Sequence, residues 1–197
     1  MAALTFAQPA RRNLFAPIAT ALVLFGIVLG LVLYLTPHTI ADISVSQPAI
    51  YAAHTVFKSN SIVVGQDPSQ DDLYLIVTVR IQDRLRLPLF IKDFTATLTP
   101  SNPDGTPAEP ITSSAVQKLD IPNLYTSFPA LKALAAQQTA QPLYREIQID
   151  PGNFAEGTVL LHFPVTQTTW NQRKTATLTI DFYHQGQLSV PIPTPKP

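Results

Sequence analysis

Side chains able to act as acids, bases or metal ligands are few and widely spaced in this sequence. It contains four histidines and no cysteine. No two histidines stand two or four residues apart, the spacings that bring imidazoles together on a strand or a helix. His162 and His184 would meet if their strands paired, and two imidazoles with a carboxylate can hold a metal. A surface or strand-end position is the more ordinary role, so the sequence predicts no metal site.

The acidic residues suggest little more. Asp71-Asp72, Asp83 and Asp93 stand beside expected strand ends and turns, where a carboxylate pair could line a glycosidase cleft but solvated loop acids are commoner. No G-x-S-x-G nucleophile motif and no glycine-rich phosphate loop occurs. Without cysteine, and with Met1 as the only methionine, thiolate and soft-ligand copper chemistry is excluded. The sequence therefore predicts no catalytic residue and no cofactor.

Charge and length restrict the class of protein further. Thirteen basic residues balance thirteen acidic ones, so there is no basic field to attract nucleic acid. A chain of 197 residues suits one domain plus an anchor. Only 13% of the residues are charged, and part of that deficit lies in one uncharged N-terminal segment.

That segment is the strongest signal in the sequence. Leu14 to Leu35 carries no charge, and its 22 residues at about 1.5 Å each span the roughly 30 Å apolar core of a bilayer. Arg11 and Arg12 precede it, whereas the first residues after it are uncharged. The positive-inside rule thus predicts a cytoplasmic segment 1–13, a transmembrane signal anchor 14–36 and an extracytoplasmic, periplasmic remainder of a protein of the inner (cytoplasmic) membrane.

Two further features of the segment bear on this prediction. A cleaved signal peptide is the alternative, but the apolar run is longer than a signal core and ends in an unsuitable cleavage context. Gly26 and Gly30 form a G-x-x-x-G pair, which would let two membrane helices pack closely.

The chain after the anchor alternates with a period of two, as β-strands do. The clearest run is Leu73 to Ile81, in which five apolar residues share one face, and we expect it to be a central core strand. Further strands are expected at Ile43–Tyr51, His54–Val64, Phe94–Thr99, Leu143–Ile149, Thr158–Val165, Thr175–Phe182 and Leu188–Ile192. Seven or eight short strands predict an all-β sandwich over 37–190, followed by a proline-rich tail at 191–197.

One segment of this domain has a helical period instead. Apolar residues between 122 and 140 recur at spacings of three and four, and Ser127 with Pro129 suits the start of a helix. We expect a helical insertion that covers one end of the core or binds a partner. Trp170 is expected to cover an edge of the core from the connection between two strands.

A mixed loop follows the central strand. Arg84, Leu85, Arg86 and Leu87 alternate charge with apolar surface, and loops at the end of a rigid sandwich are common binding sites. This makes the loop a candidate interaction site; leucines that pack inward are the alternative.

Three stretches of the domain can be compared with known families: Tyr74–Val79, Lys92–Leu98 with the Asp104-Gly105 turn, and Ile149–Gly152 leading to Glu156–Pro164. Together they resemble a bacterial family of uncharacterised exported immunoglobulin-like (telokin-like) domains. The likeness covers roughly Asp71 to Phe182, and it implies an immunoglobulin-like sandwich, no enzymatic activity and no site residues. The chain departs from the family at Gln82–Arg86 and in the extra helical segment.

Taken together, these features predict a single-pass membrane protein whose β-sandwich has a structural or protein-interaction role in the bacterial envelope. One alternative is an accessory subunit of a membrane complex that makes its contacts through the anchor helix. Another is a ligand-binding or enzymatic domain of unknown specificity, which requires at least two of His162, His184, Asp83 and Asp93 to converge in a pocket.

Overall fold

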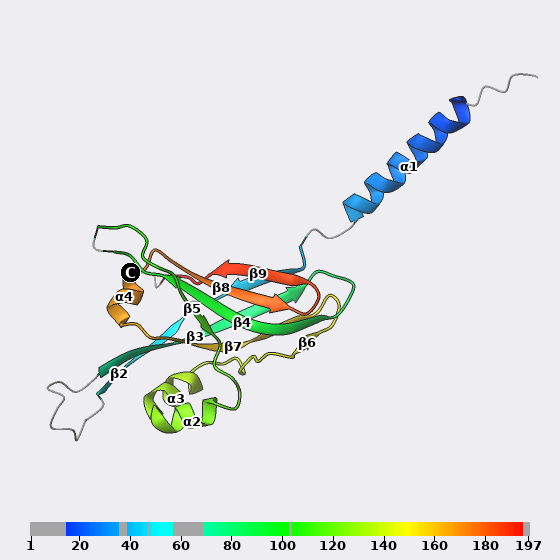
Figure 1. Cartoon of the computed structure of the whole chain (residues 1–197). Coiled ribbons are helices and arrows are strands. Elements are labelled where there is room, and N and C mark those ends of the chain that lie inside the picture. Colours follow the sequence, from blue (N-terminus) through cyan, green and yellow to red (C-terminus); the bar gives the residue numbers. More distant parts are fainter. Residues whose placement is uncertain (1–14, 36–38, 47, 57–68, 103, 195–197) are drawn as a thin grey trace, which may run out of the picture. The chain divides into compact units, whose positions relative to one another are not determined.

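The computed structural model describes residues 15–35, 39–46, 48–56, 69–102 and 104–194. The chain divides into two units, 1–38 and 39–197, of which the first contains one helix and the second all the strands (Figure 1).

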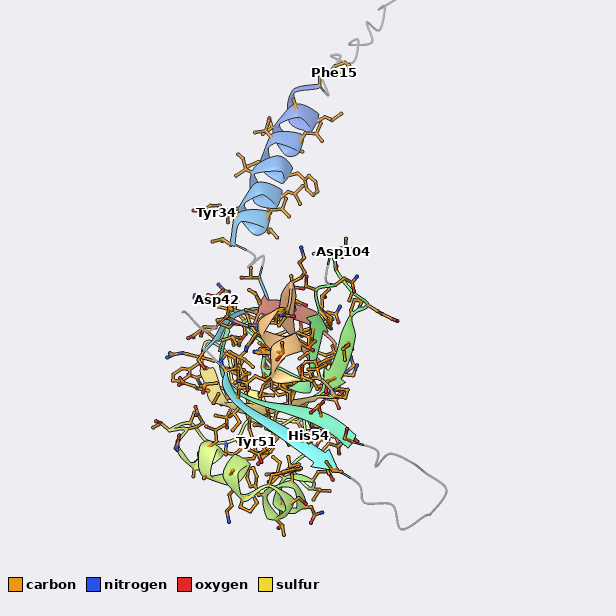
Figure 2. The ribbon with its side chains drawn as sticks, turned by 90° about the vertical axis from the view of Figure 1, so that its left-hand side faces the viewer. Phe15, Tyr34, Asp42, Tyr51, His54 and Asp104 are labelled. Carbon is orange, nitrogen blue, oxygen red and sulfur yellow. The ribbon has the colours of Figure 1, made fainter. Side chains whose placement is uncertain are left out.

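Helix α1 (Phe15–Leu35) is apolar on every side. Its described side chains are all exposed, and Figure 2 shows them radiating around the helix from Phe15 to Tyr34. Its 21 residues give a length of about 31 Å, enough to cross the apolar core of a membrane. The predicted apolar helix is confirmed, and its length and composition suit a membrane anchor or a signal sequence. Arg11 and Arg12 lie outside the described residues.

The first sheet is built around one long strand, β3 (Ser69–Asp83). Strand β7 (Phe154–Phe163) pairs antiparallel with it over residues 73–82. Strands β1 (Ala41–Val45) and β2 (Ala49–Val56) also pair antiparallel with β3, so both must lie along its other edge. Val45 of β1 pairs with Val79 of β3, and Ala49 of β2 pairs with Ile76. Between these two pairs the β1–β2 chain advances by four residues and β3 by three, so the connection between β1 and β2 contains one extra residue.

The second sheet is antiparallel too, with the order β5-β4-β8-β9. Its members are β5 (Ile111–Ser114), β4 (Leu89–Thr99), β8 (Thr175–Phe182) and β9 (Gly186–Pro191). The short β6 (Gln148–Ile149) pairs with the start of β4. The two sheets form a sandwich-like domain, which confirms the predicted mostly-β architecture.

The main core lies between the sheets and follows the period-two pattern of the strands. Leu73, Leu75, Val77, Val79 and Ile81 of β3 are fully buried in it, as their alternation predicts. They pack with the inward residues of β4, β7 and β8, among them Phe94, Leu98, Leu161, Phe163, Leu178, Ile180 and Phe182.

The outer face of the first sheet carries a second, smaller core. Helices α2 (Ile121–Ser127) and α3 (Pro129–Ala136) cover it (Figure 1). Tyr74 and Ile76 of β3 pack there with Ile121 and Leu131. Because this cover buries both faces of β3, Tyr74 and Ile76 are core residues even though they alternate with the first set.

The predicted helical insertion is therefore real but is divided at Phe128. The ring of Phe128 packs 6.0 Å from Tyr51 and 5.5 Å from Tyr74, measured between centroids, and Pro129 starts the second helix. We expected Ser127 to cap the start of the helix, but it does not. Its hydroxyl donates instead to the Asn123 carbonyl at the end of α2.

The expected strand Leu143–Ile149 is also corrected. Only Gln148–Ile149 is a strand, because Glu146 has a left-handed φ of 69° that interrupts any extended run. Residues 141–143 instead pair with β7 through two hydrogen bonds at 2.8 Å, from the Leu143 amide to the Thr158 carbonyl and from the Thr158 amide to the Gln141 carbonyl.

Residues 114–116 join the two sheets. The Ala115 amide donates to the Phe94 carbonyl of β4 at 2.8 Å, and the next amide, of Val116, donates to the Leu160 carbonyl of β7 at 2.8 Å. Consecutive amides therefore bond to opposite sheets.

The short helix α4 (Gln167–Asn171) carries the only tryptophan. Thr166 caps its start, accepting the Thr169 amide at 3.1 Å. Trp170 is fully buried beside Phe163, and the Arg173 guanidinium lies 3.8 Å from the centre of the indole. Trp170 is thus a core residue in its own right, more deeply buried than the edge position we expected.

Gly157 should be sensitive to any added side chain. A Cβ there would lie 2.6 Å from the Gln141 carbonyl oxygen and 2.7 Å from Leu143 Cβ. We expect Gly157→Ala to lower the free energy of unfolding by about 1–3 kcal/mol, because segment 141–143 must move off β7. Guanidinium unfolding of the detergent-solubilised full chain, followed by Trp170 fluorescence, measures this. Gly26→Ala in α1, where a Cβ meets nothing within 4 Å, is the control and should leave the midpoint unchanged.

Candidate functional site

A hollow lined by polar side chains lies at a gap along one edge of β4. Strand β6 pairs with β4 at residues 89–90, and β5 pairs with it at 95–98. Between them the partner chains diverge and enclose a pocket of about 230 Å³. Asp93 and Phe94 of β4 form one wall, residues 114–119 after β5 a second, and residues 143–146 before β6 a third.

One backbone amide of β4 at this gap, that of Phe94, is bonded to a side chain and not to a neighbouring strand. The Phe94 carbonyl accepts the Ala115 amide, while the Phe94 amide donates to the Asp93 carboxylate at 2.9 Å. Strands β5 and β6 are therefore separated by a short stretch of the β4 edge, where the Asp93 side chain caps the Phe94 amide. Capping by an acidic side chain is a common way to protect an open edge.

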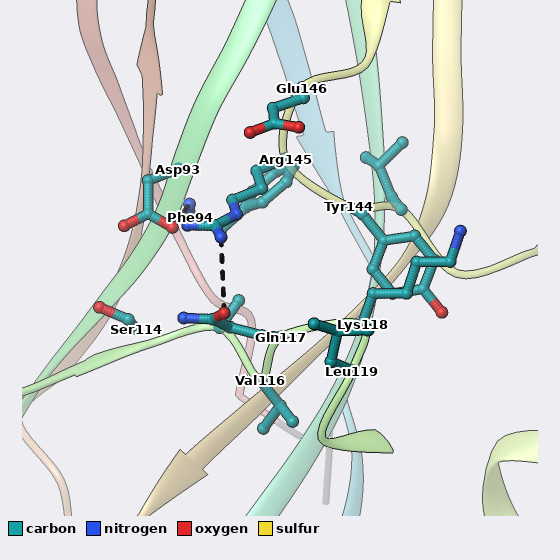
Figure 3. Close-up of a pocket in the computed structure, with 12 residues that line it drawn as sticks. Asp93, Phe94, Ser114, Val116, Gln117, Lys118, Leu119, Tyr144, Arg145 and Glu146 are labelled. Atoms are coloured by element: carbon teal, nitrogen blue, oxygen red, sulfur yellow. Dashed lines mark hydrogen bonds between the residues drawn. The ribbon is translucent and has the colours of Figure 1, made fainter. Parts of the chain in front are cut away.

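Charged side chains of both signs line this pocket (Figure 3). Arg145 reaches across it and makes one long hydrogen bond, 3.5 Å, to the Gln117 side-chain oxygen. The Lys118 ammonium lies 5.4 Å from the centre of the Tyr144 ring. Among the described residues, no ion pair joins Arg145 or Lys118 to Asp93 or Glu146.

An exposed leucine completes the rim. Leu119 lines the same pocket and is 84% exposed. Leu119 thus adds one exposed apolar side chain to a pocket of mixed charge.

Of the predicted acids and histidines, Asp93 lines this pocket and the others lie elsewhere. His162 Nε2 lies 2.7 Å from Asp72 Oδ1, and the His162 ring stacks on Tyr74 at 4.9 Å between centroids. Gln70 donates to the same Asp72 oxygen at 2.9 Å. Burial raises the pKa of the Tyr74 phenol, and the nearby Asp72 charge adds to the rise. This cluster joins β3 to β7 beneath the helices.

Asp83 is almost wholly buried at the other end of β3. Its carboxylate accepts the Leu85 amide at 2.7 Å and the Gly152 amide at 3.2 Å. His184 is exposed in the turn between β8 and β9, with a left-handed φ of 63°. None of the hydrogen bonds of the described residues joins any two of His162, His184, Asp83 and Asp93. No group of three or more potential metal ligands occurs in the part of the chain that the structure describes.

The predicted interaction loop is partly used by the fold. Arg84 is ion-paired with Asp42 of β1, and its amide donates to the Ile40 carbonyl at 3.1 Å. Leu85 packs against the main core, whereas Arg86 is exposed and Leu87 is 61% exposed. Only the second half of the loop therefore presents a free surface.

The polar pocket itself was not recognised in the sequence. Arg145, Lys118 and Asp93 come from three segments that are far apart in the chain. The one local signal is the charged pair Arg145-Glu146 inside the otherwise alternating run Leu143–Ile149, which is better explained by a turn than by a strand.

Comparisons with known proteins name no family for this chain. No family model matches it, and no curated protein matches it. A solved structure titled "X-ray structure of Northeast Structural Genomics Consortium target SoR45" is similar at 9% sequence identity and a TM-score of 0.30. That similarity covers 76% of this chain and 88% of the other. Similarity this distant carries no functional argument, so the proposals below rest on the geometry of this chain.

Proposed function

We propose that this chain is a membrane-tethered, non-enzymatic interaction protein of the bacterial envelope. The observation that carries the proposal is α1, a helix of 21 residues that is apolar and exposed on every side. With Arg11 and Arg12 on its cytoplasmic side, α1 is an uncleaved signal anchor and the β domain lies in the periplasm.

The partner contact is made at the polar pocket beside β4. Arg145 and Lys118 offer cations, Asp93 and Glu146 offer carboxylates, and Leu119 offers an apolar anchor. A polypeptide segment, with charges of both signs and a hydrogen-bonding backbone, matches this mixture. Half of the 84–87 loop, Arg86 and Leu87, is a second exposed surface for contact.

The partners of the buried acids support a non-enzymatic role. Asp83 and Asp72 are the two buried carboxylates among the described residues, and both are hydrogen-bonded to groups that join strands or turns. Both carboxylates thus make contacts that hold the fold together. The two antiparallel sheets agree with an immunoglobulin-like type of sandwich, which we retain as part of this proposal.

A second candidate is an accessory subunit that assembles through α1. A Cβ added at Gly26 or Gly30 would meet nothing within 4 Å, so the fold of the single chain needs neither glycine. Close packing against another helix would need both. Replacing both with leucine leaves assembly unchanged if the β domain makes the contact and abolishes it if α1 does.

The absence of cysteine makes the topology directly testable. Thr5→Cys and Thr106→Cys each create one thiol, and a C-terminal tag reports the length of the mature chain. We expect a membrane-impermeant maleimide to label Thr106→Cys but not Thr5→Cys in cells with a permeabilised outer membrane. A mature N-terminus near residue 40, or the reverse labelling, contradicts the proposal.

The contact surface is tested in the same cells by a photo-crosslinking amino acid at position 119. We expect discrete adducts from position 119, weakened by Arg145→Glu, and none from the matched exposed position 187 on β9. Equal adducts from both positions, or adducts insensitive to Arg145→Glu, contradict a contact at this pocket.

A further inference from the structure

A second cavity lies between the helical pair and the outer face of the first sheet. It has a volume of about 270 Å³, close to the lower end of the range for small-molecule sites. Its floor includes Ile76 of β3 and Leu160 of β7, and its roof includes Tyr125 of α2 and Ala135 of α3. The cavity exists because α3 presents small side chains where larger ones would close the space.

The far wall of this cavity is rigid. Residues 141–143 are held on β7 by the paired hydrogen bonds with Thr158 and by their close approach to Gly157. Pro142 and Leu143 of this segment line the cavity. This wall of the cavity is therefore held in place by its contacts with the first sheet.

On the helical side, in contrast, few residues are completely buried. Ile121 is the one buried residue of α2, and Leu131 the one buried residue of α3. A third hollow, of about 320 Å³, lies on the other side of α2 and is lined by Leu124 and Tyr74. Because α2 rests on the sheet between two hollows, a ligand can enter with a small displacement of that helix.

The chemistry of the cavity is apolar with one cation. Lys132 of α3 is its only charged lining residue, and no carboxylate lines it. Lys132 is exposed, and its ammonium has no ion pair or hydrogen bond among the described residues. The Tyr125 phenol faces the same space, and burial together with Tyr144 raises its pKa, so it stays a neutral hydrogen-bond donor.

We propose that this cavity binds a single-chain anionic amphiphile, with the acyl tail between the sheet and α3 and the carboxylate or phosphate head at Lys132. An apolar tail gains free energy by leaving water in proportion to the area it buries. The exposed ammonium then fixes the orientation of the head. This ligand site goes beyond the proposed function. The cavity adjoins the polar pocket, with which it shares Ala115, Val116, Leu143 and Tyr144, but Lys132 and the helices belong to the cavity alone.

The test uses the full chain in nanodiscs of zwitterionic lipid and a dodecanoic acid that carries a diazirine near its methyl end. After illumination, digestion and mass spectrometry locate the labelled residues. Labels on α1 report partition into the bilayer and serve as an internal reference. We expect labels on peptides spanning 121–160 at a level comparable with α1.

Filling the cavity should remove those labels selectively. Ala135→Trp places an indole in the cavity, and the matched control Ala133→Trp places one on the exposed face of the same helix. We expect at least a tenfold loss of 121–160 labelling in Ala135→Trp and none in Ala133→Trp, with α1 labelling equal in both. Ala140→Leu fills the cavity from the loop and decides the matter if Ala135→Trp does not fold.

The charge of the head is tested separately. Lys132→Gln should lower labelling by the dodecanoic acid about threefold to tenfold and leave labelling by its methyl ester unchanged. Unlabelled dodecanoate and unlabelled lysophosphatidylglycerol are then added as competitors, and the stronger competitor identifies a free fatty acid or a lipid as the source. The proposal is overturned if labelling of 121–160 survives in both filling variants, or if neither competitor reduces it. It is also overturned if Lys132→Gln lowers labelling by the acid and by the ester equally.

Discussion

Trp170→Ala should lower the free energy of unfolding by about 3–5 kcal/mol, a large part of the stability of a single domain. The indole is fully buried, and its removal leaves a cavity at the end of the main core. It also removes the aromatic face beneath Arg173, whose guanidinium donates to the Trp170 carbonyl at 2.8 Å and the Pro193 carbonyl at 3.2 Å. Burial lowers the pKa of Arg173, so the surroundings of this cation are already poorly solvated.

The measurement is guanidinium unfolding of the detergent-solubilised full chain followed by circular dichroism, because the variant has no tryptophan. Phe154→Ala is the matched control. Phe154 also lies beneath an arginine, with the Arg80 guanidinium 4.0 Å from its ring centre, but it is 52% exposed. We expect less than about 1 kcal/mol from the control. Equal losses for the two variants would show that the arginine contact, and not burial, determines the effect.

Asp83→Ala should cost about 3 kcal/mol in the free energy of unfolding. The change removes two hydrogen bonds to a charged acceptor and leaves the Leu85 and Gly152 amides in a buried site without that acceptor. The end of β3 would lose its side-chain contact with the turn before β7, while the Asp83 amide would still donate to the Asn153 carbonyl at 2.9 Å. Trp170 fluorescence reports the unfolding midpoint directly.

Asp150→Ala is the control for this prediction because it removes the same type of side chain from the turn that Asp83 contacts. Asp150 is exposed and accepts one hydrogen bond, from the Gln148 side chain at 2.8 Å. We expect its unfolding midpoint to stay within about 0.5 kcal/mol of the parent protein. An Asp83→Ala variant as stable as Asp150→Ala would refute the structural role of Asp83.

The strands were predictable where one face of a strand meets one core. Leu73 to Ile81 alternates because only its inward set packs between the sheets, and that pattern is visible in the sequence. Burial of Tyr74 and Ile76 was not predictable in this way, since it depends on helices that are distant in the chain. The run Leu143–Ile149 was misread because its alternation hides the left-handed φ of Glu146, which sequence periodicity does not reveal.

The candidate site was less predictable than the fold. Asp83 was identified as a possible chemical group, but its type and position fit a buried turn anchor equally well, and only its two amide partners distinguish the roles. Arg145, Lys118 and Asp93 are brought to one pocket by the pairing of β4 with two different strands. No local spacing encodes that arrangement, so the sequence predicted the long apolar helix and the mostly-β domain but not the pocket.

The connection at residues 114–116 has a consequence for how the domain unfolds. Because adjacent amides of Ala115 and Val116 bond to β4 and β7, neither sheet can open without breaking a bond to the other. Local opening would then extend through both sheets at once, making them a single cooperative folding unit. The amide hydrogens of this short link are expected to exchange with solvent only when the whole sandwich unfolds.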